Sequence, residues 1–315
     1  MLAGFFFQRE IFPSLNFGLW LRSAVAIFFL ILVWFFVLVI AIIEMPGTFG
    51  LTTWLAAGVV FVLFLVYPFG LGLLLMRWFR IVLPATESLK RLVADVSHAM
   101  QIPVRATWIL PSYISNAAAF PHTRQLLFTD RLLATLPDEE TKAICAHELG
   151  HLSEPGSVKF VRGFTLIAFF PLIFTQPLLG LDYKNVKVLL VLLGLCLFLL
   201  LVLLFIKRMG RRMEMRADKI AVENHSDRAV YARALLRLYE AGQIPAVMPR
   251  RSAKVHPDLY DRMTAAGVTL DFPRPLPPKK QSWTSYFTFV CVVLVPIVAG
   301  FWKAMQMVLN ANNPY

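Results

Sequence analysis

The sequence predicts an α-helical integral membrane protein that carries an α+β domain on the cytoplasmic side of the membrane. Of its 315 residues, 58% are hydrophobic, which is more than a soluble globule of this length needs to bury. Long apolar stretches alternate with two polar stretches. The excess of apolar side chains therefore faces lipid, and the polar stretches supply a domain outside the membrane.

Five apolar stretches are long enough to cross a hydrocarbon layer of about 30 Å, which takes roughly 20 helical residues. The first is far longer than the core of a signal peptide, so we expect it to be retained as an anchor. Pro171 and Pro177 interrupt the third, which either spans fully or is kinked and partly re-entrant. The predicted spans are residues 19–43, 53–76, 163–181, 186–206 and 284–308.

Basic residues concentrate at three flanks of these spans, whereas the opposite loops are poor in positive charge. The positive-inside rule makes the basic flanks cytoplasmic, with the N-terminus inside and the C-terminus outside. Topology thus accounts for the net charge of +12 better than nucleic-acid binding does, because the basic residues form no single stripe with interleaved aromatics. The flanking residues include Arg77, Arg80, Lys207, Arg208, Lys279 and Lys280.

The predicted spans divide the chain into five parts. Because the central hairpin crosses the membrane twice, the two polar parts lie on the same side and form one domain. The parts are a transmembrane hairpin (1–76), the first half of the polar domain (77–162), a second transmembrane hairpin (163–206), the second half of the domain (207–283), and a last span with a short tail (284–315).

Within the first polar half, helical periodicity predicts a helix over 87–100, and extended segments are predicted over 105–110, 113–120 and 125–129. Pro137 followed by three acidic residues begins a helix that runs to about Leu152.

The second polar half opens with a basic helix over 207–223. Asp227 then lies in the predicted cap of a helix that ends near Gly242.

The helix that follows Pro137 carries His147, Glu148 and His151. Residues four apart lie on one helix face, so both imidazoles can reach a single ion. Zinc accepts such ligands, and a catalytic site holds it with three protein ligands and keeps a position open for water. Glu148 is placed to take the proton of that water as it attacks a peptide carbonyl. The alternative is that two surface histidines share this spacing by chance.

A third ligand weakens that alternative. Glu214 and Asp218 share one helix face, so Glu214 can bind metal while Asp218 accepts a hydrogen bond from the outer ring nitrogen of a ligating histidine. Otherwise both acids pair with neighbouring arginines in a solvated helix. The two predicted crossings over 163–206 return Glu214 to the side of the histidines, which favours the metal site.

Five motifs follow one another along the chain: Asn116-Ala117-Ala118, Phe128-Thr129-Asp130, Ala146 to His151, Glu214 to Asp218, and His256-Pro257 with Arg262. In this order they resemble the HtpX-type family of membrane zinc metallopeptidases, relatives of the CaaX prenyl endopeptidases, over residues 77–265. The chain departs from the family in having five apolar runs where four are usual, and Ala119-Phe120-Pro121 where a glycine-rich turn is common.

The resemblance implies a zincin-like α+β domain with one Zn²⁺ per chain, in a bacterial inner membrane. It also implies that Asn116 and Ala117 belong to an edge strand to which an extended substrate adds by main-chain hydrogen bonds. A plain packed strand is the equal alternative.

The same resemblance places His256 or Arg262 near the developing oxyanion. His256 is otherwise a structural residue beside a proline turn. Arg262 is otherwise paired with Asp258 or Asp261.

The predicted function is an endopeptidase that cleaves membrane or misfolded proteins at the cytoplasmic face, a role in protein quality control. Its expected partners are a polypeptide substrate and the lipid bilayer, and no oligomeric state is predicted. Alternatives are a CaaX-type prenyl-protein endopeptidase and a non-catalytic scaffold or sensor. A transporter is disfavoured because the central portions of the spans contain no Asp, Glu, Lys, Arg or His.

Overall fold

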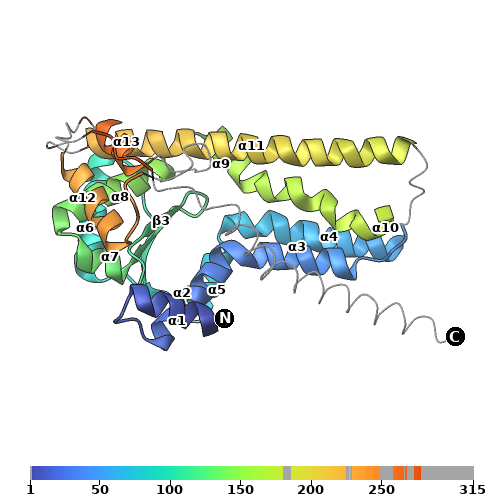
Figure 1. Cartoon of the computed structure of the whole chain (residues 1–315), viewed down its shortest axis with the longest axis horizontal. Coiled ribbons are helices and arrows are strands. Elements are labelled where there is room, and N and C mark those ends of the chain that lie inside the picture. Colours follow the sequence, from blue (N-terminus) through green and yellow to red (C-terminus); the bar gives the residue numbers. More distant parts are fainter. Residues whose placement is uncertain are drawn as a thin grey trace.

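In the computed structural model of the chain, described residues are 2–179, 186–224, 227, 229–247, 258–265, 267 and 273–277. Long apolar helices lie lengthwise side by side, and a domain of shorter helices around a small sheet lies at one end of them (Figure 1). This is the arrangement expected of a membrane protein whose polar parts join into one domain.

Four helical segments among the described residues are long and apolar enough to cross a membrane, and they correspond to the first four predicted spans. The fifth prediction, 284–308, lies outside the described residues. The segments are Phe17–Glu44, made of α2 (Phe17–Ile27), the π-helical turn η1 (Phe28–Leu32) and α3 (Val33–Glu44); Leu51–Phe69, made of α4 (Leu51–Val66) and η2 (Tyr67–Phe69); Gly156–Leu178; and Leu193–Glu223.

The second span differs from its prediction because the helix does not continue over 53–76. Pro68 lies in the 3₁₀ turn η2, and Gly70 has φ of +94°, a left-handed conformation that glycine adopts without strain. A separate helix, α5 (Leu71–Trp78), begins after this turn. The chain therefore changes direction at Gly70, where the apolar helices meet the domain.

The third span is irregular, as its prolines predict. It consists of α9 (Gly156–Phe164), the 3₁₀ helix η3 (Thr165–Phe174) and α10 (Thr175–Leu179). Pro171 lies inside η3, where its missing N–H removes a bond that a regular α-helix would need. By length and composition the whole segment suffices to cross a membrane.

The fourth span and the predicted basic helix form one element. Helix α11 runs without interruption from Val186 to Glu223, joining the residues of 186–206 to those of 207–223. An unpredicted helix, α1 (Leu2–Ile11), precedes the first span and packs through Phe5 against Trp20, in a buried cluster that also contains Tyr113.

The sheet of the domain has the order β1-β2-β4-β3, with β2 parallel to β4 and the other pairs antiparallel. Its side chains alternate: Ile109 and Phe128 face the core of the domain, while Leu110 and Leu127 face α2 and α5. Strand β3 is last in the order, so one of its edges faces away from the sheet. The strands are β1 (Leu83–Pro84), β2 (Ala106–Leu110), β3 (Ala117–Phe120) and β4 (Gln125–Thr129).

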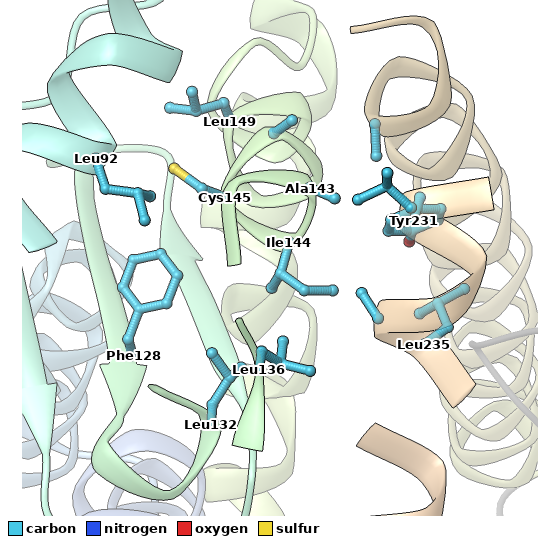
Figure 2. Close-up of a cluster of buried hydrophobic side chains, with 14 of the residues drawn as sticks. Leu92, Phe128, Leu132, Leu136, Ala143, Ile144, Cys145, Leu149, Tyr231 and Leu235 are labelled. Carbon is cyan, nitrogen blue, oxygen red and sulfur yellow. The ribbon is translucent and has the colours of Figure 1, made fainter. Parts of the chain in front are cut away.

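Helix α8 passes through the middle of the core. Figure 2 shows Cys145 and Leu149 of this helix on the side of Leu92 and Phe128, with α12 on its other side. Because neighbours surround it, α8 holds its polar residues in fixed positions. The helices of the domain are α6 (Glu87–Met100), α7 (Asp130–Thr135), α8 (Asp138–Leu152), α12 (Ala229–Ala241) and α13 (Leu259–Ala265).

Candidate active site

The structure brings His147 and His151 of α8 together with Glu214 of α11. Nε2 of His147 lies 3.7 Å from Oε2 of Glu214, and Nε2 of His151 lies 3.5 Å from Oε1. Ligands held tetrahedrally at about 2.1 Å from one ion are about 3.4 Å apart, close to these separations. The three buried side chains therefore offer two nitrogens and an oxygen to a single divalent metal ion.

Helix α11 reaches the histidines because α8 has a glycine at the crossing. A Cβ added at Gly150 would lie 3.0 Å from the Cα of Ala217. Beside this contact, Arg216 donates to the carbonyl oxygens of Gly150 (2.9 Å) and Ser153 (3.1 Å), where the end of α8 leaves carbonyls without helical partners. The crossing fixes the distance between Glu214 and the two histidines.

A Gly150→Ala substitution is therefore expected to push α11 away from α8. Overpacking of this kind costs about 1–3 kcal/mol, and here it also separates Glu214 from the histidines. We expect a lower melting temperature and weaker metal binding, measured by thermal unfolding and metal titration in detergent. Gly156→Ala is the matched control, because nothing lies within 4 Å of the added Cβ there. Equal metal affinity in the two variants would show that the glycine does not set the crossing.

A buried network orients the ring of His147. Its Nδ1 lies 3.1 Å from Oδ1 of Asp218 and 2.9 Å from the hydroxyl of Tyr231, so Nε2 points toward Glu214. Arg262 donates to both oxygens of Asp218, at 2.9 and 2.6 Å. Burial alone would raise the pKa of Asp218, but the hydrogen bond from His147 and the charge of Arg262 lower it well below its usual value. The carboxylate therefore remains ionised behind the histidine.

Glu154 supports His151 in the same way. Its Oε1 lies 2.9 Å from Nδ1 of His151 and accepts a hydrogen bond of 2.8 Å from Arg162. Burial alone would lower the pKa of His151, but this bond and the charges of Glu148 and Glu214 raise it. The surrounding carboxylates thus favour a positive charge at this position, and a bound metal ion would supply that charge.

Sequence reasoning missed Glu154 and Tyr231. Glu154 could have been found from the sequence, because an acid three residues after His151 lies close to it when the helix ends there. Tyr231 could not, since it comes from α12 and meets His147 only through the packing of the domain.

The partners of Arg262 also differ from the sequence alternative. Its guanidinium bonds to Asp218 and to the Tyr231 hydroxyl (2.8 Å), whereas Asp258 and Asp261 accept hydrogen bonds from Arg274. His256, the other candidate near the oxyanion, lies outside the described residues.

The metal-ligand cluster opens into a cleft of about 290 Å³. Glu148 lines it beside the two histidines, and residues 116–119, which include Asn116 and Ala117, form one wall along β3. Leu235 of α12 contributes an apolar surface. A candidate metal position, a carboxylate for proton transfer and a strand edge therefore share one cavity, the set of groups that hydrolysis of an extended chain requires.

A comparison with protein-family models matches residues 84–268 to peptidase family M48, and a search of curated proteins finds no match. The matched region begins in β1 and extends beyond α13, so it contains every residue of the cleft described above. It covers more than half of the chain. The protein therefore belongs to peptidase family M48, a family of metallopeptidases.

Proposed function

We propose that this protein is an HtpX-type, zinc-dependent membrane endopeptidase that hydrolyses peptide bonds of membrane or misfolded proteins at the cytoplasmic face. The observation that carries the proposal is the meeting of His147, His151 and Glu214 within reach of one ion, in a cleft that also contains Glu148. The basic flanks of the spans support the cytoplasmic placement.

Two histidines and a carboxylate are a donor set that zinc takes in catalytic sites. When bound there, zinc lowers the pKa of water and polarises a carbonyl oxygen. Glu148 takes one proton from the water molecule while the oxygen of that water forms a bond to the peptide carbonyl carbon. It then gives a proton to the departing amine nitrogen as the C–N bond breaks. His147, held by Asp218, and His151, held by Glu154, keep their Nε2 atoms directed at the metal position.

Strand β3 is the proposed platform for the substrate. Its edge position and its residues in the cleft support main-chain pairing with an extended polypeptide at Asn116 and Ala117. The hydrogen bonds of Arg262 favour a role in holding Asp218. We therefore assign oxyanion stabilisation to His256.

The proposal predicts that metal removal abolishes peptide cleavage. Purified protein in detergent is expected to contain one zinc per chain and to cleave casein. A chelator should remove both metal and activity, and added Zn²⁺ should restore activity where Mg²⁺ does not, because Mg²⁺ prefers oxygen ligands in octahedral geometry. Elemental analysis and fragment release measure the two quantities. Full cleavage after complete metal removal would contradict the proposal, and a zinc-loaded protein without cleavage would indicate a scaffold.

A further inference from the structure

We infer that the cleft is held at a short, fixed distance from the bilayer and leads to it along β3, so that its preferred substrate is a chain segment adjoining a membrane span of another protein. The inference rests on the proposed function and adds to it the position of the cleaved bond. Three features of the described residues support it: the length of α11, the position of the β3–β4 turn, and the wall of the cleft.

Helix α11 sets the distance between the metal position and the bilayer. Its apolar run ends at Ile206, and Lys207 and Arg208 follow, the residue types that lie at the level of lipid head groups. Glu214 comes eight residues after Ile206 in the same uninterrupted helix. At 1.5 Å per residue, the metal position lies about 12 Å from the end of the apolar run. A continuous helix keeps this distance constant.

The turn that follows β3 shows that this strand leads toward the apolar helices. The ring of His122 lies 5.0 Å from that of Phe69, the last residue of the second candidate span. Thr123 packs against Gly70, where an added Cβ would lie 2.9 Å from its methyl carbon. A Cβ at Gly163 of α9 would lie 3.1 Å from the ring of His122. The turn therefore touches two of the apolar segments, as Figure 1 shows for the hairpin that includes β3.

Strand β3 connects the metal position to the turn that contacts the apolar segments. It begins at Ala117 beside the metal ligands and ends at Phe120 before the turn. Its four residues extend over about 13 Å at 3.3 Å each, which agrees with the distance along α11. The cleft follows the same line, because Ala119 and Arg162 both line it and Gly163 comes next in α9. A chain paired with β3 thus has one end at the metal site and the other at the bilayer.

The two distances predict that cleavage occurs about four residues from a substrate span or just beyond, since an extended residue covers about 3.3 Å. A shorter connection does not reach the metal. A longer one reaches it but loses the high local concentration that membrane anchoring provides. Soluble chains remain substrates, at rates set by their own concentration.

The test uses single-span substrates placed with the full-length enzyme in liposomes. One cleavable casein sequence is separated from the span by Gly/Ser spacers of about two, five, ten and twenty residues, on either side of the span. We expect little cleavage at two residues and a maximum near five. The rate then falls by about eight-fold between five and twenty residues, as the −3/2 power of spacer length. The Glu148→Gln enzyme is the non-cleaving control.

The same casein sequence as a free peptide separates this inference from the proposed function. Cleavage of the peptide with equal rates at all spacers would overturn the inference and leave the endopeptidase intact. Failure to cleave the peptide and every anchored substrate would overturn both. A maximum near twenty residues would also contradict the inference, because it places the cleft too far from the bilayer.

Cross-linking gives a readout that does not depend on turnover. In the Glu148→Gln enzyme with Cys196 and Cys291 replaced by serine, a cysteine is placed at Ala117 or at Ala119. Single cysteines are then moved along the substrate spacer. We expect the Ala119→Cys enzyme to capture spacer residues about two positions nearer the span than the Ala117→Cys enzyme does. The reverse order would show that the substrate does not run along β3 toward the membrane.

Discussion

Replacing Glu148 with glutamine is expected to lower the kcat for casein cleavage by about 10²–10⁴-fold, the usual contribution of a general base. Glutamine keeps the size of the side chain but accepts no proton at neutral pH. Because Glu148 lines the cleft without being one of the three candidate ligands, the variant should keep its zinc and its melting temperature. Cleavage rate, zinc content and thermal unfolding are measured on the same preparation.

Glu139→Gln is the matched control for this substitution. Glu139 lies in the first turn of the same helix, far from the cleft, and forms an exposed ion pair with Lys142 (2.8 Å). Such pairs contribute little to stability, so this variant should retain full activity. If Glu148→Gln cleaved casein as fast as the wild type, the proton would be transferred by another group, and the role assigned to Glu148 would be wrong.

Replacing His147 with alanine is expected to abolish both metal binding and cleavage. The change removes one of three candidate ligands and leaves Asp218 without its imidazole partner. We expect the metal affinity to fall by more than about 100-fold, because changing only an outer partner of a ligand costs 10–100-fold. Asp218→Asn should therefore give an intermediate loss. Metal titration monitored by elemental analysis distinguishes the two variants.

His98→Ala provides the control for a lost histidine. His98 is exposed on α6 and contributes nothing to the metal-ligand cluster. This variant should bind one metal ion with wild-type affinity. An unchanged metal content in His147→Ala would mean that the ion is held elsewhere, and the ligand set His147, His151 and Glu214 would have to be abandoned.

Local sequence was sufficient to identify four candidate spans and the centre of the candidate site. Apolar length identified the four segments that the structure also shows, because crossing a bilayer imposes a minimum number of apolar residues on any helix. The spacing of His147 and His151 placed both imidazoles on one face, since helical geometry fixes the positions of residues four apart. Counting crossings brought Glu214 to the same side. Each of these inferences depends on a period or a length, which the order of residues alone contains.

The support of the site depends on distant segments meeting in three dimensions. Tyr231 comes from α12 and Arg262 from α13, yet both bond to Asp218 of α11, and the competing acids Asp258 and Asp261 are instead bonded to Arg274. Charge pairing from sequence favours near neighbours, but burial decides which partner an ionised group must find.

The positions of the helix breaks in the spans show the same limit of reasoning from sequence. Proline and glycine marked where regular helix is costly, and packing decided that the chain turns at Gly70 while α11 continues through its basic stretch to Glu223. Sequence alone therefore determined the four apolar segments long enough to cross a membrane and the face of α8 that carries both histidines. The tertiary structure decided which side chains hold that face in place and how far it lies from the end of the apolar helices, because both depend on contacts between residues far apart in the chain.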